Sequence, residues 1–365
     1  MLNLSPNSPA ELADALRKAG DKKQSIEAGG NFSKSLWGGP LREADVRIST
    51  ARLSSIIQYE PRDLTISVGA GMSYATLTRL VGGNRQMIPL DPPYAPKATI
   101  GGVIATNLSG SRRRLFGSAR DLVIGMQFAT MEGKLVQSGG MVVKNVAGLD
   151  MGKLLIGSFG TLGVLASINF KLIPVPEDHC TFVRSFSTAA EAVTERNRLL
   201  VGVLQPAGID LLNPAAAEIL GHKGFLLILP VGGSKAVLDR YKRELSTYHV
   251  APNDTLIGRV AEFSADFLNR NTKGAIARVS TRLQGLLSLL ETETRPLVIR
   301  AANGVAFLHL ANAREPFPGV LEAGSERGAV VQWPTPGNDF PVMEKIKRMM
   351  DPAHLLNKGR LYGRI

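Results

Sequence analysis

The chain has 365 residues, of which 44% are hydrophobic and 20% are charged, and its formal net charge is +12. This length exceeds one ordinary hydrophobic core and predicts two domains, while the composition is typical of a soluble globular protein. No apolar run reaches the roughly 18 residues that a bilayer span needs, and no secretory signal is recognisable. The only cysteine, Cys180, excludes an internal disulfide, an iron–sulfur cluster and a thiolate zinc site. We therefore expect a reducing, cytoplasmic setting.

The positive charge attracts anions, among them phosphate cofactors, carboxylates, acidic partner proteins, anionic lipid and nucleic acid. The basic residues are scattered along the sequence, and aromatic residues make up only 6% of it. Stacking platforms and zinc-finger spacings, which are typical of nucleic-acid binding, are not visible. We therefore expect no nucleic-acid partner and no metal site. Peripheral association with the inner face of the cytoplasmic membrane stays open.

The predicted elements begin with a helix from Pro9 to Gly20. Ser8 suits the N-cap, Pro9 suits the first helical position, and Glu11 completes a capping box. Short β-like stretches follow at 24–28, 46–49, 56–59 and 64–68, then a helix after Ser73 as far as Val81, a hairpin formed by 123–130 and 134–137, and a strand at 164–173.

Pro174 and Pro176 mark the predicted domain boundary, because the proline pair interrupts the strand pattern. Beyond it we expect strands at 181–186, 225–230, 297–300 and 305–310, and helices at 189–200, 235–248 and 340–350. The sequence therefore predicts an α+β fold with domains at 1–176 and 177–335, followed by a C-terminal segment at 336–365.

Glycine-rich segments recur through the first domain. The first of them, Ala28–Lys34, follows a predicted strand and could form a backbone nest for an anion, with Ser33 and Lys34 as further donors. Taken alone, such a loop is more often a tight turn. Further segments with small polar neighbours lie at 89–93, 98–102, 107–110, 117–121, 144–150 and 157–164. Their number indicates one extended ligand that is gripped along its length.

The order of these motifs carries a resemblance to a known family. The motifs are the Gly-Gly loop, Pro89-Leu90-Asp91-Pro92-Pro93, Ala98-Thr99-Ile100-Gly101-Gly102, Gly117-Ser118-Ala119-Arg120-Asp121 and Gly160-Thr161-Leu162-Gly163-Val164. This order resembles the FAD-binding domain of the vanillyl-alcohol oxidase/p-cresol methylhydroxylase (PCMH-type) family. More narrowly, Leu108–Arg114, Val143–Gly148 and the ending from Asp351-Pro352 through Asn357–Arg360 are similar to the smaller, FAD-binding (E) subunits of bacterial glycolate oxidases.

The resemblance implies a two-part FAD-binding domain, a smaller α+β cap with an antiparallel sheet, and a C-terminal segment that returns to the FAD domain. It also implies a set of cofactor-binding residues. These are Gly29, Gly30, Asn31, Phe32, Ser33, Lys34, Pro89, Thr99, Ile100, Gly101, Gly102, Asn107, Ser109, Gly110, Gly117, Arg120, Asp121, Lys144, Asn145, Gly148, Gly160, Thr161, Leu162, Gly163, Val164, Asn357 and Arg360.

Two departures from the family pattern concern histidine. Many relatives tether FAD through a histidine of the first loop, but here the first histidine is His179, so we expect FAD to be bound non-covalently. The larger, substrate-oxidising subunits carry a paired-histidine segment, whereas the similar place here reads Ala301–Val305 with only His309 nearby. His309 is a weak catalytic candidate, and its apolar neighbours favour a core position.

Three functions stay open. The first is the FAD-binding subunit of a glycolate or other 2-hydroxyacid dehydrogenase complex, an oxidoreductase acting on CH–OH groups. Hydride would pass from the hydroxy acid to FAD, and electrons would pass to a larger FAD subunit and an iron–sulfur subunit, or to a quinone. The second is a self-sufficient FAD oxidase of a small alcohol or hydroxy acid. The third is a non-catalytic flavoprotein subunit. Arg112, Arg113 and Arg114 could attract a substrate carboxylate or an acidic partner, or could form a solvated basic face.

We predict that acid or heat releases intact FAD from the purified protein, because the first loop contains no histidine that could tether the cofactor. Absorption spectra of the supernatant and the pellet after precipitation check this. Flavin that stays with the denatured polypeptide would contradict it.

Overall fold

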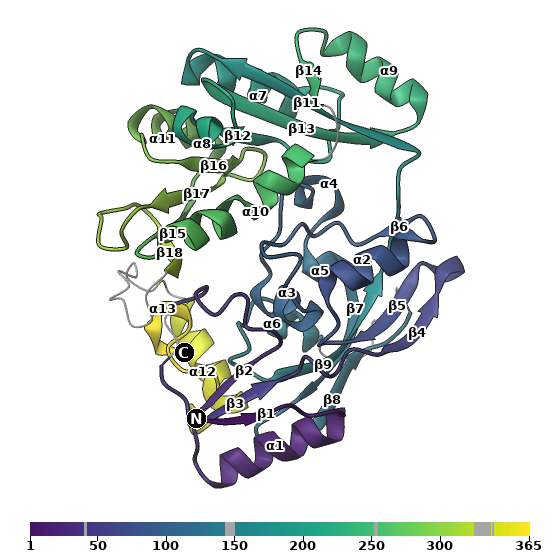
Figure 1. Ribbon diagram of the computed structural model, residues 1–365, viewed down its shortest axis with the longest axis vertical. Coiled ribbons are helices and arrows are strands. Elements are labelled where there is room, and N and C mark those ends of the chain that lie inside the picture. Colours follow the sequence, from purple (N-terminus) through teal and green to yellow (C-terminus); the bar gives the residue numbers. More distant parts are fainter. Residues whose placement is uncertain (40–41, 143–149, 252–254, 325–336, 338) are drawn as a thin grey trace.

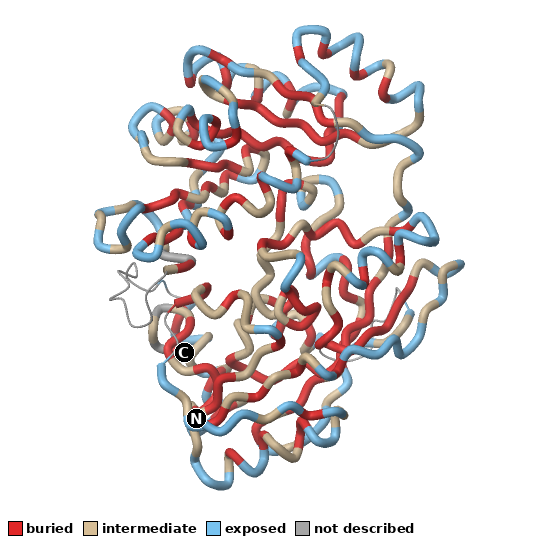
Figure 2. The backbone as a smooth tube through the Cα atoms, viewed as in Figure 1, coloured by how far each residue is buried: buried red, intermediate tan, exposed pale blue. Residues whose placement is uncertain are grey.

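The computed structural model describes residues 1–39, 42–142, 150–251, 255–324, 337 and 339–365. Two parts lie one above the other along the longest axis; both ends of the chain build the first part, and the middle builds the second (Figure 1). Buried residues are concentrated along the strands of both parts (Figure 2). The mixture of helices with antiparallel sheets confirms the predicted α+β class. Among the described helices, none is both long and apolar enough to cross a bilayer.

Within its described residues, the first part contains three sheets. A parallel sheet has the order β1-β3-β2, with β1 at Leu2–Leu4, β2 at Ile26–Gly29 and β3 at Val46–Ser49. An antiparallel sheet has the order β4-β5-β9-β7-β8, with bounds Ile56–Glu60, Thr65–Gly69, Val164–Lys171, Val123–Ala129 and Leu135–Gly139. The short strands β6 (Gln86–Met87) and β10 (Ile173–Pro174) pair with each other.

The helices of the first part include one that begins within a glycine-rich segment. α1 (Pro9–Asp21) begins as predicted, with the Ser8 side chain accepting the N–H of Glu11. The glycine segment after Thr99 is α3 (Ile100–Thr106), whose N-cap is Thr99. The remaining helices are α2 (Tyr74–Gly82), α4 (Arg113–Phe116), α5 (Ala119–Leu122) and α6 (Gly152–Leu155).

The second part, here called the cap, is built on one antiparallel sheet with the order β14-β11-β13-β12-β16-β17-β15-β18. Its strands are β11 (Asp178–Phe186), β12 (Asp210–Leu212), β13 (Phe225–Gly233), β14 (His249–Ala251), β15 (Ala275–Ser280), β16 (Leu297–Arg300), β17 (Val305–Leu310) and β18 (Val320–Gly324). Its helices are α7 (Ala189–Val201), α8 (Pro214–Ile219), α9 (Lys235–Glu244), α10 (Thr255–Arg270) and α11 (Leu286–Thr292). The chain enters the cap directly after β10.

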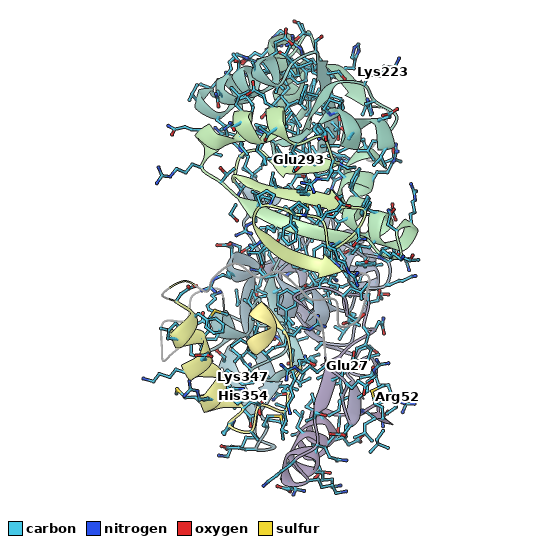
Figure 3. The ribbon with its side chains drawn as sticks, turned by 90° about the vertical axis from the view of Figure 1, so that its left-hand side faces the viewer. Glu27, Arg52, Lys223, Glu293, Lys347 and His354 are labelled. Atoms are coloured by element: carbon cyan, nitrogen blue, oxygen red, sulfur yellow. The ribbon has the colours of Figure 1, made fainter. Side chains whose placement is uncertain are left out.

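The C-terminal helices α12 (Phe340–Met350) and α13 (Leu361–Arg364) lie against the first part (Figure 1). The backbone after α12 runs beside β2, because Ile26 donates its N–H to Leu355 and accepts the N–H of Asn357. Figure 3 shows Lys347 of α12 in the same half of the molecule as Glu27 of β2.

Lys347 anchors the C-terminal segment from inside the first part. Its fully buried Nζ donates to the carbonyl oxygens of Thr161, at 2.8 Å, and Leu356, at 2.9 Å, and pairs with Asp351 at 2.8 Å. The Asp351 carboxylate also accepts the N–H groups of Leu355 and Leu356. Burial lowers the pKa of Lys347, and the Asp351 charge opposes that shift. The pair is thus held by hydrogen bonds that offset its desolvation.

We predict that Lys347→Met destabilises the protein by about 3 kcal/mol or more, because it leaves the Asp351 carboxylate buried without its cation. Urea denaturation followed by circular dichroism measures this. Lys345→Met, at an exposed position of the same helix, is the matched control and should stay within about 0.5 kcal/mol of the wild type. Equal midpoints for the two variants would contradict the anchoring role.

Candidate functional site

A first cavity is lined by turns from widely separated segments of the first part. It is narrow, about 90 Å³, and its lining is Ala28, Gly29, Gly30, Asn31, Phe32, Ser33, Lys34, Ser35, Thr50, Thr99, Gly101, Gly102, Ala105, Thr106, Ser158, Phe159, Gly160, Gly163, Val164, Leu165, Asn357 and Arg360. The structure therefore brings together the first glycine loop, the start of α3, the turn before β9 and the C-terminal segment. An intact dinucleotide would require these segments to separate further.

Glycine is required where this backbone is crowded. A Cβ on Gly30 would lie 2.1 Å from Oγ1 of Thr99, which itself accepts the N–H of Gly102 at the start of α3. A Cβ on Gly101 would press on Ala70, 3.0 Å away, so this glycine serves the packing of α3. The first loop can approach Thr99 at the start of α3 only because Gly30 has no side chain, while Gly101 allows α3 to pack closely against Ala70.

Asn357 joins the two glycine-rich walls of the first cavity. Its Oδ1 accepts the N–H of Ala28 at 2.8 Å, and its Nδ2 donates to the carbonyl oxygens of Ala28, Phe159 and Gly160 at 3.1, 3.0 and 3.2 Å. The buried amide is therefore fully occupied by backbone groups. Asn357 therefore acts as a clamp: its hydrogen bonds hold the loop after β2 against the turn before β9.

Arg360 and Trp37 fix the other end of the first loop. Arg360 donates to the carbonyl oxygens of Trp37 and Gly39. Trp37 is 1% exposed and packs against Leu268 and Ala323 of the cap. The indole thus anchors the first loop where the two parts of the molecule meet.

Lys34 is a buried cation in the wall of the first cavity. Its side chain is 7% exposed, and its Nζ has no hydrogen-bond partner among the residues that the structure describes. Burial lowers the pKa of Lys34 to about 8, while the negative charge of Glu262 on α10 acts in the opposite direction. An unpaired buried ammonium beside a glycine nest fits an anionic ligand such as the diphosphate of FAD.

A second, wider cavity of about 480 Å³ lies between the first part and the cap. Its lining is Gly38, Thr106, Asn107, Leu108, Ser109, Gly110, Arg113, Gly157, Phe159, Arg278, Arg300, Asn303, Val305, Phe307, Val320, Met343 and Leu361. Thr106 and Phe159 line both cavities, so the two adjoin. Asn107, Ser109 and Gly110, which were expected at the dinucleotide, thus face the second cavity.

Arginine dominates the charge of this second cavity. Arg113 comes from the first part, while Arg278 and Arg300 come from β15 and β16 of the cap. Arg300 pairs at 2.9 Å with Asp210, a fully buried carboxylate whose pKa is raised by burial despite Arg300. The described lining includes no histidine, carboxylate or tyrosine. This arrangement can bind a carboxylate but supplies no evident general base.

The run of three arginines does not form one basic face. Arg112 pairs with Asp91 of the Pro-x-Asp-Pro-Pro motif, and Arg114 donates to the Pro206 carbonyl of the cap at 2.6 Å. Arg113 alone lines the second cavity. The three neighbouring side chains at the start of α4 therefore make different contacts, and attraction of an acidic partner stays a prediction.

The Arg120–Asp121 motif lies outside both cavities. Asp121 accepts the N–H of Ser118 in a capping box, and Arg120 donates to the Lys153 carbonyl. A Cβ on Gly117 would touch Asp121, so the glycine serves this turn. Pro89, Ile100, Thr161 and Leu162 also line neither cavity. Lys144, Asn145 and Gly148 lie outside the described residues.

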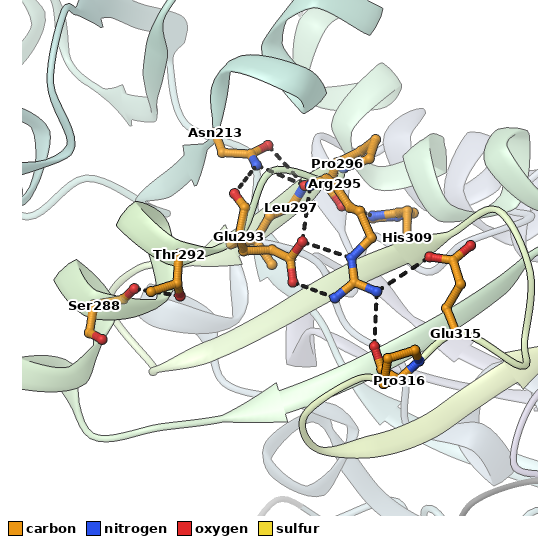
Figure 4. Close-up of polar contacts among 10 residues, drawn as sticks. All are labelled: Asn213, Ser288, Thr292, Glu293, Arg295, Pro296, Leu297, His309, Glu315 and Pro316. Carbon is orange, nitrogen blue, oxygen red and sulfur yellow. Dashed lines mark hydrogen bonds and ion pairs between the residues drawn. The ribbon is translucent and has the colours of Figure 1, made fainter.

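His309 is a core residue, and its catalytic candidacy is contradicted. The ring is 1% exposed, lies edge-on to Phe263 and Phe267, and lines neither cavity. Nδ1 lies 3.0 Å from the Pro296 carbonyl oxygen, so this nitrogen carries the proton (Figure 4). Nε2 accepts a hydrogen bond from the Ser264 hydroxyl at 2.9 Å. Burial lowers its pKa to about 4, so the ring is neutral at neutral pH.

Comparison with known proteins agrees with this geometry. The family described as "FAD binding domain" matches residues 3–139. Glycolate oxidase subunit GlcE of Escherichia coli (strain K12) is 36% identical over 374 aligned residues, which cover all of both chains. Glycolate oxidase subunit GlcD of Bacillus subtilis (strain 168) is 27% identical over 210 residues, 58% of this chain and 45% of that relative. The solved structure of 4-ethylphenol oxidase from Gulosibacter chungangensis superimposes with a TM-score of 0.73 at 13% identity, covering 98% of this chain and 88% of that one.

Fold and site together define an FAD-binding oxidoreductase with a PCMH-type domain and a cap. The chain belongs to this family and, within it, to the group of the glycolate oxidase E subunits, because it matches such a subunit over its full length. FAD is therefore its cofactor, and the donor set of the first cavity fits it.

We predict that Asn357→Ala weakens FAD binding by about tenfold or more, because the hydrogen bonds between the two glycine walls are lost. Titration of the cofactor-free protein with FAD, followed by flavin fluorescence, measures the dissociation constant. Lys358→Ala, next along the chain and outside the lining, is the control and should bind FAD as the wild type does. Unchanged affinity of the Asn357 variant would remove the clamp from the site.

Proposed function

We propose that this chain is the FAD-binding subunit of a glycolate oxidase-type 2-hydroxyacid dehydrogenase complex. The observation that carries the proposal is the arginine-lined second cavity, which adjoins the dinucleotide cavity at Thr106 and Phe159. FAD, when bound, accepts a hydride from the α-carbon of a hydroxy acid, the chemistry of oxidoreductases that act on CH–OH groups. The full-length similarity to a glycolate oxidase subunit supports the same function.

The residues of the first cavity would bind the cofactor, and those of the second cavity would bind the substrate. The first loop with Lys34, the start of α3 and the turn at Gly160 would hold the dinucleotide. Arg278 and Arg300 would attract the carboxylate of a small hydroxy acid from the cap side, with Asp210 holding Arg300 in place. Asn303 and Ser109 could bind its hydroxyl group. FAD is expected to be held non-covalently.

In this proposal the electrons that reach FAD leave through another protein or a quinone, because a chain with one cysteine cannot hold an iron–sulfur cluster as an internal relay. The partners that we propose are a larger FAD subunit, of the kind that is similar to this chain over 210 residues, and an iron–sulfur subunit. The complex would work in the cytoplasm, with peripheral contact at the inner face of the membrane as a further possibility.

A self-sufficient oxidase is the second candidate, since the chain carries its own anion-attracting cavity beside the FAD cavity. The absence of a histidine, carboxylate or tyrosine from the described lining favours the subunit function, because removal of the hydroxyl proton then needs a group from elsewhere. A non-catalytic flavoprotein subunit would share the FAD site but not the need for the arginines.

We predict that glycolate and D-lactate reduce the FAD of the isolated chain slowly or not at all, and that adding the partner subunits accelerates the reduction. Anaerobic stopped-flow spectroscopy of the FAD-loaded protein measures the rate of bleaching. Rapid reduction of the isolated chain, in the range of about 1–10³ s⁻¹ typical of turnover, would establish the self-sufficient oxidase. No reduction even in the reconstituted complex would favour the non-catalytic subunit.

A further inference from the structure

Lys34 has a property that sets it apart from the other anchors of the first loop. Asn357 and Arg360 are engaged with backbone carbonyl groups, so their polar atoms help to stabilise the folded chain. The Lys34 ammonium is equally buried, yet it has no acceptor within the described part of the chain. A buried unpaired charge lowers the stability of the folded state. The fold therefore tolerates Lys34 at this position without gaining a hydrogen bond from it.

The charged groups around Lys34 do not form a hydrogen bond or an ion pair with its ammonium group within the described part of the chain. Glu262 of α10 is the carboxylate whose field reaches it, but the two oxygens of Glu262 accept the N–H groups of Tyr94, at 2.8 Å, and Ala95, at 2.7 Å. Arg360 is cationic and lines the same cavity. Asp266, also on α10, acts on Tyr94. A second anion is needed to pair with Lys34.

We propose that Lys34 is reserved for the diphosphate of FAD: the cofactor-free fold is less stable because of this lysine, and the bound cofactor supplies the missing anion. The negative charge of oxidised FAD lies on its diphosphate, since the adenine, the ribityl chain and the oxidised ring are neutral. Lys34 follows Gly29 and Gly30, whose backbone lies in the same cavity wall. The inference rests on FAD binding and on no feature of the substrate reaction.

This role has a signature that a purely structural lysine lacks. Replacing a structural lysine destabilises the protein with and without cofactor. Replacing Lys34 by methionine, which has a similar length and no charge, removes the unpaired buried ammonium and should stabilise the cofactor-free protein. The same change should weaken FAD binding. A substitution that raises the stability of the cofactor-free protein but lowers its affinity for FAD therefore identifies a residue that serves ligand binding and not folding.

The affinity for FAD should depend on pH, and it should fall as the pH rises above the pKa of Lys34. The cofactor-free protein holds Lys34 with a pKa of about 8, and a bound diphosphate favours the charged form and raises that pKa. Below pH 8 both states carry the proton, so the affinity for FAD is constant. Above pH 8 binding must take up a proton, so the affinity falls as the pH rises. Arginine at this position stays charged and should remove that decline.

The test compares Lys34→Met, Lys34→Arg and the control Lys97→Met, an exposed lysine beyond the lining. FAD dissociation constants are measured by fluorescence from about pH 6.5 to about pH 9.5, and thermal midpoints are measured without cofactor. We expect Lys34→Met to bind FAD about tenfold or more weakly than the wild type at neutral pH. Its FAD affinity should not fall further above pH 8. Without cofactor, the variant should melt at a higher temperature than the wild type. Lys34→Arg should bind without the decline, and Lys97→Met should match the wild type.

Two results would overturn the proposal. One is an FAD affinity of Lys34→Met that stays within about twofold of the wild type, as expected if the lysine served only a reduced, anionic flavin. The other is a cofactor-free Lys34→Met protein that is less stable than wild type. Rapid reduction of the bound FAD by a hydroxy acid in the isolated chain would contradict the subunit function and would not affect these two measurements, so the two proposals can fail separately.

Discussion

The cofactor cavity depends on one buried amide. Asn357 bonds the loop after β2 and the turn before β9 at the same time, although these two backbone segments belong to different sheets. The amide is itself held in place, because Lys347 and Asp351 fix the backbone that leads to it. The C-terminal segment is therefore part of the cofactor site, and the region that matches the FAD-binding family closes its cavity only with residues from the far end of the chain.

Part of the positive charge of the chain is concentrated at the two cavities of the site. Lys34 faces the first cavity, while Arg113, Arg278 and Arg300 face the second, and shared lining residues join the two. The positive electrostatic potential in both cavities would thus attract both an anionic cofactor and an anionic substrate. The cap takes part in both places, through Glu262 near the first loop and through β15 and β16 at the second cavity.

Local sequence signals predicted what depends on local physics. The cap of α1 at Ser8, the strands β16 and β17 and the gathering of several glycine segments followed from spacing, capping and motif order. Side-chain direction could not be predicted in this way. His309 points into the core, and the arginines at 112–114 diverge, because tertiary contacts with Ser264, Asp91 and Pro206 decide their orientation. Arg278, Arg300 and Glu262 carried no motif and needed the sheet and α10 to bring them to the site.

Hydrogen–deuterium exchange of the cofactor-free protein, with and without added FAD, measures whether four separate segments close around one dinucleotide. These segments are 28–35, 99–106, 158–165 and 357–360. We expect FAD to slow exchange in all four segments together. Protection that is confined to one glycine loop, or that leaves 357–360 unchanged, would contradict it.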